Sequence, residues 1–151
     1  MPPVDAVRSA SVADLDPTTL YAILRLRTDV FVVEQECPYP ELDGRDLEPD
    51  ARQLWIEQDG VVVATLRLLN DDGEARIGRV ATAPPARGTG LAALLVQRAL
   101  ELVATDDPAA DIVLDAQSYL ADWYERFGFR RDGEEYVEDG IPHVPMRLRA
   151  G

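Results

Sequence analysis

The chain has 151 residues, a formal net charge of −13 and 46% hydrophobic residues. This length suits one domain over residues 1–151 with one core, and the hydrophobic content is too high for a disordered segment. No apolar run approaches the ~20 residues that a membrane span needs. The N-terminal residues carry neither the basic nor the apolar region of a secretory signal. The acidic charge argues against a nucleic-acid-binding surface, which would be basic.

Cys37 is the only cysteine, which excludes an internal disulfide and a cysteine zinc cluster. Asp43 and Asp46 lie in an acidic stretch, but their spacing does not complete a calcium loop, so no metal site is predicted. We therefore expect a cytoplasmic domain without nucleic-acid or membrane partners. Its acidity favours cationic ligands such as protonated amines.

The first third of the chain predicts a short strand, a helix and a long loop. Residues 4–10 favour the strand. Asp16 is a cap-type residue before Pro17, and proline suits the first turn of a helix, so a helix is predicted to begin here. Residues 34–50 are rich in Glu, Asp, Pro and Gly and predict the loop. The helix is supported by apolar residues at helical spacing: Leu20, Ile23, Leu24, Val30 and Phe31.

The middle of the chain predicts an antiparallel meander. Strands are expected over residues 53–57, 61–69 and 74–82. Asp59-Gly60 is a dipeptide typical of hairpins, and residues 70–73 supply a second turn.

The second half predicts two helices and three strands. From Leu91 to Val103 apolar residues repeat at steps of three and four, as on one face of a helix. The elements in order are a helix from Gly90 to about residue 105, a buried parallel strand over 111–116, a helix over 119–127, and strands over 129–137 and 144–149 joined through 138–140. The order β-α-β-β-β-α-β-α-β-β indicates an α/β or α+β domain with a mixed sheet.

A glycine-rich turn precedes the helix that begins after Gly90. The first turn of a helix has unpaired N–H groups and the positive end of the helix dipole. Gly88 and Gly90 let the backbone approach an anion, and Arg87 adds a fixed charge with forked donors. The turn therefore suits a phosphate or pyrophosphate. The alternative is that the glycines serve only the geometry of a strand–helix turn.

A dinucleotide-binding interpretation fits the same residues. Residues 88–93 match the G-x-G-x-x-G/A fingerprint, and Asp111 or Asp115 follows about twenty residues later. Three features argue against it: residues 84–86 separate the turn from the strand, a meander precedes the turn, and little chain follows for further crossovers.

Residues 87–92 resemble the acetyl-CoA signature [QR]-x-x-G-x-[GA] of GNAT acetyltransferases. The strand before them resembles the fourth strand of that fold, whose backbone pairs with the pantetheine arm and which a bulge splays from the next strand. The resemblance implies that acetyl-CoA binds to these cofactor residues: Val80, Ala81 and Thr82 along the pantetheine, and Arg87, Gly88, Thr89, Gly90, Leu91 and Ala92 at the pyrophosphate.

Residues 123–129 are similar to the family's Tyr-x-x-x-Gly-Phe element. The resemblance makes Tyr124 a cofactor contact and the candidate general acid for the departing CoA thiolate, a role that a phenol can fill. The alternative is an aromatic side chain used for packing. Gln117 stands where many members carry a cofactor-contacting Asn, which implies a contact from its amide.

Nearly the whole chain resembles the ElaA-type subfamily of these acetyltransferases. The resemblance is carried by residues 30–35, 38–39, 43–46, 116–117 and 138–143. It implies the GNAT acyl-CoA N-acyltransferase fold, transfer of acetyl from acetyl-CoA to a primary amine by direct attack on the thioester, and a family tendency to dimerise. The acceptor is a small-molecule or peptide amine of unspecified identity. The alternative is a CoA-binding sensor without turnover.

Two residues are candidates for a base at the acceptor. His143 is the only histidine, and it is expected just before the last strand, near the substrate cleft. Glu34 ends the first helix together with Glu36 and can face the amine. The alternatives are a hydrogen-bonded structural histidine and a solvated acidic loop. Cys37 is interpreted as a small buried residue.

Overall fold

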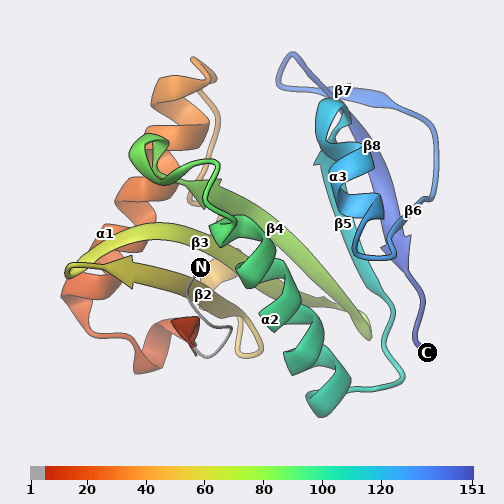
Figure 1. Ribbon diagram of the computed structural model, residues 1–151, viewed down its shortest axis with the longest axis horizontal. Coiled ribbons are helices and arrows are strands. Elements are labelled where there is room, and N and C mark those ends of the chain that lie inside the picture. The colour runs from red at the N-terminus through yellow and green to blue at the C-terminus, as the bar shows by residue number, and fades with distance from the viewer. Residues whose placement is uncertain (1–5) are drawn as a thin grey trace.

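The computed structural model describes residues 6–151 and shows a mixed sheet with helices on both faces (Figure 1). The mixed sheet is confirmed, and so is the predicted order of elements as far as the last helix; three strands follow that helix where two were predicted. The strands are β1 (Arg8–Ala10), β2 (Arg52–Gln58), β3 (Val61–Asp71), β4 (Glu74–Thr82), β5 (Ile112–Gln117), β6 (Arg130–Arg131), β7 (Tyr136–Glu138) and β8 (Ile141–Leu148). The helices are α1 (Pro17–Thr28), α2 (Leu91–Asp106) and α3 (Ala121–Glu125).

The strands follow the spatial order β1-β2-β3-β4-β5-β8-β6, and β7 pairs with β8. The pairing of β4 with β5 is parallel, and the other pairs are antiparallel. Of the first predicted strand, residues 8–10 form β1, and positions 4 and 5 lie outside the described residues.

Helix α1 begins where local chemistry predicts. The carboxylate of Asp16 accepts a hydrogen bond from the backbone N–H of Thr19 at 2.9 Å, and Pro17 occupies the first turn. The cap satisfies an N–H group that has no partner within the helix. After Thr28 the chain continues as a π-helical turn, Asp29–Glu34, which carries Glu34 to the mouth of the site described below.

Two apolar clusters fix the layers. Helix α2 packs on one face of the sheet through six buried residues, and Tyr124 and Ala121 of α3 join the same cluster. Helix α1 and the π-helical turn after it pack on the opposite face, where Ile23, Leu26 and Val30 form a cluster with Trp55 and Ala81. Full burial of each large apolar side chain contributes about 1.5–3 kcal/mol. The buried face of α2 is formed by Leu91, Leu94, Leu95, Val96, Ala99 and Val103.

The predicted elements that follow β5 differ from the structure in their division or their bounds. The strand predicted over 129–137 is divided into β6 and β7. Asp132 N–H still donates to the carbonyl of Pro145 in the register of β6 with β8, and the chain leaves the ladder at Gly133, which has φ of +152°. The helix predicted over 119–127 is shorter because residues 118–120 form a 3₁₀ turn before α3.

The feature that positions the site is the separation of β4 from β5. The two strands pair only at Ala75 with Ile112 and at Arg76 with Val113. Beyond Arg76 the edge of β4 that faces β5 has no strand partner among residues 6–151. The sheet is therefore split, with α2 beside one half and α3 beside the other (Figure 1).

Candidate functional site

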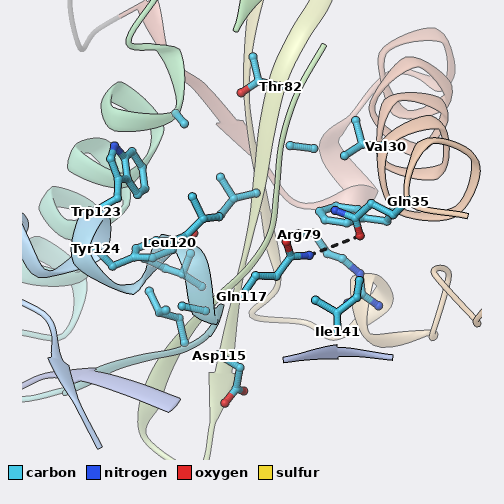
Figure 2. Close-up of a pocket in the computed structure, with 18 of the residues that line it drawn as sticks. Val30, Gln35, Arg79, Thr82, Asp115, Gln117, Leu120, Trp123, Tyr124 and Ile141 are labelled. Carbon is cyan, nitrogen blue, oxygen red and sulfur yellow. Dashed lines mark hydrogen bonds between the residues drawn. The ribbon is translucent and has the colours of Figure 1, made fainter. Parts of the chain in front are cut away.

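A cleft of about 630 Å³ occupies the split between β4 and β5. Side chains from both faces of the sheet line it, so it connects the α2 face with the α1 face. Figure 2 shows Trp123, Tyr124 and Leu120 on one side and Gln35 and Ile141 on the other. Every cofactor or catalytic residue predicted from the sequence lines this cleft except Thr89.

A bulge in β4 widens the cleft. Thr65 of β3 is in register with Ala81, whereas Arg67 is in register with Gly78, so β4 contains one extra residue at Arg79 and Val80. Arg79 has φ of +53°, a left-handed conformation that costs a non-glycine residue on the order of 1–3 kcal/mol. This bulge is the feature that the family resemblance implied for this strand.

The glycine-rich turn presents backbone at the start of α2. Gly88 and Gly90 have φ of +77° and +83°, left-handed values that favour glycine. Gly90 is the N-cap residue of α2, and no side chain forms a capping hydrogen bond with the first N–H groups of the helix. A Cβ added at Gly88 would meet no atom within 4 Å, so the turn is open there. The Thr89 hydroxyl is turned back to the carbonyl of Ala86, to which it donates at 2.6 Å. At Thr89, therefore, only the backbone is in a position to contact an anion.

Arg87 lies beside this turn and is held in place by two partners. Its Nε donates to the carbonyl of Thr82 at 3.0 Å, and Nη1 and Nη2 each donate to Glu34 at 2.6 Å. The hydrogen bonds from Arg87 lower the pKa of Glu34. A carboxylate with a lowered pKa is a weaker base, so the structure gives Glu34 an ion-pairing role. Guanidinium has five N–H donors, and one N–H on each terminal nitrogen remains for an anion.

Tyr124 is buried in the cleft wall on the α3 side. Its side chain is 6% exposed and packs edge-on against Trp123 and Phe129. Burial raises the pKa of the phenol, because the phenolate would be poorly solvated. The hydroxyl therefore remains protonated at neutral pH, which is the state that a proton donor needs.

His143 lies within β8, and the expectation that it precedes the last strand is wrong. The strand is longer than predicted because Pro142 and Ile141 pair with β7. His143 Nδ1 lies 2.7 Å from the carbonyl oxygen of Ile141. A carbonyl oxygen only accepts, so Nδ1 carries the proton and the Nε2 lone pair of the neutral ring is available as a base. The ring stacks on Tyr136.

Two contacts cross the cleft on the α1 face. The Gln117 side-chain amide donates to the Gln35 side chain at 3.4 Å, as Figure 2 shows. The thiol of Cys37, which is buried as predicted, lies 3.4 Å from the carbonyl of Asp139. The π-helical turn and the segment after it therefore touch the β5–β8 half of the sheet.

A buried charge network beneath the α1 face was missed by sequence reasoning. Arg27 is fully buried and pairs with Glu41 and Asp46, and Arg67 pairs with Asp43 and Asp46. The segment predicted as a long loop, residues 34–50, is thereby fixed to the sheet. One signal was present, since Arg67 interrupts an otherwise apolar strand, and a charge at such a position needs a partner.

The α2 side of the cleft fits coenzyme A in three respects. The start of α2 offers unpaired N–H groups for a pyrophosphate, the open turn at Gly88 admits it, and the exposed edge of β4 offers backbone groups to an amide-containing arm. None of the helices formed by residues 6–151 is long and apolar enough to cross a membrane.

Comparison with known proteins agrees with this geometry. Residues 27–150 match the family described as "Acetyltransferase (GNAT) domain". A UPF0039 protein of Mycobacterium tuberculosis is 51% identical over 152 residues, covering 97% of this chain and 94% of that protein.

Two solved structures are similar along almost their whole length. An acyl-CoA N-acyltransferase from Pseudomonas aeruginosa is 43% identical with a TM-score of 0.89, covering 94% of this chain and 98% of that one. Escherichia coli ElaA is 36% identical with a TM-score of 0.90, covering 95% of this chain and 99% of that one. The split sheet, the glycine turn at the start of α2 and these relatives lead to one conclusion: the chain belongs to the GNAT acetyltransferase family, beside the ElaA and UPF0039 proteins.

Proposed function

We propose that this chain is an acetyl-CoA-dependent N-acetyltransferase that acts on a primary amine by direct attack on the thioester. The observation that carries the proposal is the cleft itself, which joins an anion-binding helix start on the α2 face to a polar chamber on the α1 face. The name of the similar Pseudomonas protein, an acyl-CoA N-acyltransferase, supports an acyl-CoA donor.

The donor is held from the α2 side. Backbone N–H groups of residues 88–92 and the two remaining N–H groups of Arg87 bind the pyrophosphate, and the edge of β4 at residues 80–82 binds the pantetheine. Gln117 lies opposite, at the end of β5. When bound, acetyl-CoA supplies an activated acetyl thioester.

Proton transfer is divided between the two faces. His143 Nε2 takes a proton from the acceptor amine on the α1 face, directly or through a water molecule. Tyr124 donates its phenolic proton to the leaving sulfur on the α3 side, because burial keeps the phenol protonated. The backbone N–H of Val80 is the donor for the carbonyl oxygen, since Val80 lies in the bulge whereas Ala81 is in register with Thr65.

Two measurements test the proposal. Calorimetric titration with acetyl-CoA measures donor binding, and detection of released thiol across amino acids, polyamines, aminoglycosides and peptide N-termini measures turnover. Absence of saturable binding at millimolar acetyl-CoA contradicts the proposal. Binding without turnover on any acceptor supports the sensor alternative instead.

A further inference from the structure

Two arginines lie at the floor of the acceptor side of the cleft. Arg67 on β3 and Arg79 on β4 both line the cleft on the α1 face, where the acceptor must enter if the donor occupies the α2 face. Their side chains are 5% and 20% exposed, so Arg79 is the one that reaches the chamber. Figure 2 places Arg79 between the Gln35–Gln117 pair and Ile141.

The guanidinium of Arg79 is anchored from behind. Its Nη2 donates to the carbonyl of Glu41 at 3.1 Å and to Asp43 at 3.3 Å, and its Nε lies 2.7 Å from Glu41 Oε1 as an ion pair without a hydrogen bond. The ring of Tyr39 lies beneath it, 5.5 Å from the guanidinium carbon. Among residues 6–151, no hydrogen-bond acceptor contacts Nη1 of Arg79. A fixed cation therefore presents one unused pair of N–H donors.

Arg67 adds a second unused donor. The residue is 4% exposed and lines the cleft. Its Nε is buried and has no hydrogen-bond partner among the described residues. Across the ladder it faces Gly78, where an added Cβ would meet no atom within 4 Å. A buried donor without a partner beside open space is what an anionic ligand would satisfy.

The carboxylates on this face do not offer an equivalent site for a cation. Asp115 is paired with Arg76 at 2.7 Å, and Glu41 and Asp43 are paired with the arginines described above. Glu138 and Asp139 line the cleft only from the exposed hairpin between β7 and β8. The groups left without a partner inside the chamber are therefore N–H donors of Arg79 and Arg67, which suit a negative group, although the chain as a whole carries −13.

We propose that Arg79, supported by Arg67, binds the carboxylate of the acceptor, so that the acceptor is an amine that also carries a carboxylate: an amino acid. This inference rests on the proposed function for its description of the ligand as an acceptor. The strained backbone of Arg79, with φ of +53°, directs the side chain to this position from within the bulge. Guanidinium suits the task because its fork matches a carboxylate.

Equilibrium binding tests the subsite without relying on turnover. The probes are N-acetylated amino acids with small, aromatic, acidic and basic side chains, each paired with its C-terminal amide, titrated with and without CoA. At least one carboxylate is expected to bind tenfold or more tightly than its amide. N-acetylated dipeptides form a further arm: if they bind as tightly as the single amino acids, the ligand is a peptide and the assignment to amino acids is overturned.

Variants assign the discrimination to Arg79. Arg79→Met is expected to weaken carboxylate binding to the level of the amide, a loss of at least tenfold, and to leave amide binding unchanged. Arg8→Met, which removes an exposed arginine paired with Glu57 at the far edge of the sheet, is the control. Arg79→Lys retains the charge without the forked donors, and its affinity for the carboxylate is expected to lie between those of the wild type and Arg79→Met. It also provides the test if Arg79→Met does not fold.

The outcomes separate the two proposals. Equal binding of carboxylates and amides by the wild type, or no binding of either, overturns the subsite even if amines are acetylated. Carboxylate binding that depends on Arg79 supports the subsite, even in a chain that fails to bind acetyl-CoA and so contradicts the proposed function.

Discussion

Glu34 and Arg87 form a two-point ion pair, with both oxygen–nitrogen distances at 2.6 Å, between the end of the first helical segment and the glycine turn before α2. The pair places a carboxylate beside the proposed pyrophosphate site. Glu34→Gln removes this negative charge and keeps a hydrogen-bond acceptor for Arg87. Acetyl-CoA is expected to bind about two- to fivefold more tightly, a small effect because both side chains are roughly half-exposed.

Calorimetry at low ionic strength measures that change, and added salt is expected to reduce it. Arg87→Gln is the companion variant, and it is expected to bind acetyl-CoA about tenfold more weakly than the wild type. Weaker binding by Glu34→Gln would show that Glu34 chiefly orients Arg87.

Gly88→Ala tests the anion turn. The expected result is acetyl-CoA binding weakened by at least about tenfold, because the added methyl group would occupy open space at the proposed pyrophosphate site. Gly60 provides a matched control, since it has the same φ of +77° and an equally open Cβ position in the β2–β3 hairpin. Both variants are expected to lose about 1–2 kcal/mol of stability from the left-handed backbone, measured by urea unfolding. Equal effects of both on acetyl-CoA binding contradict the assignment.

Tyr124→Phe tests the general acid. The turnover number is expected to fall by about 10²–10⁴-fold, with acetyl-CoA affinity unchanged, because only the proton donor is removed. Tyr21→Phe, at an exposed position on α1, is the control. Since burial raises the pKa of Tyr124, activity is not expected to decline from phenol ionisation below the ordinary tyrosine pKa of about 10. An unchanged turnover number in Tyr124→Phe would remove this role.

His143→Asn tests the base. The asparagine amide can replace Nδ1–H as the donor to Ile141, but it supplies no base in place of Nε2. Turnover is expected to fall by about 10²-fold with the fold retained. Thiol release measured beside the melting temperature separates the two effects. Activity within a factor of about two of the wild type would assign His143 a structural role.

Asp43 predicts a pH dependence of stability. Burial opposes its ionisation, but hydrogen bonds from Arg67 and the backbone of Arg45 outweigh this effect and lower the pKa from 3.8 to about 2. A lowered folded-state pKa contributes stability above the unfolded value and loses it as pH falls through the folded value. The loss is therefore expected between about pH 4 and pH 2, and after discounting for solvent screening it amounts to about 1 kcal/mol.

Urea unfolding at pH 5, 4, 3 and 2 measures this dependence. Asp43→Asn is expected to be less stable at pH 5 and to show a shallower slope across the window. A slope equal to that of the wild type would assign the acid sensitivity to other carboxylates.

Local signals in the sequence predicted much of the molecule. Asp16 with Pro17 marked the start of α1, and the glycines at 88 and 90 marked the turn before α2, because each acts through its own backbone or nearest neighbours. The pairing of Glu34 with Arg87, and the network behind Arg79, join residues that lie far apart in the chain. No periodicity encodes such contacts, so they required the folded structure.

The two-residue pairing of β4 with β5 gives the cleft a pivot at one end. From Arg76 to Thr82 the strand extends about 20 Å at ~3.3 Å per residue. Over that arm, a rotation of about 3° changes the width at the mouth by ~1 Å, which is enough to disturb a catalytic alignment. Substitutions at Ala75 or Ile112 are therefore expected to change the width of the cleft, and the change is expected to be greatest at the end of β4 farthest from this pairing.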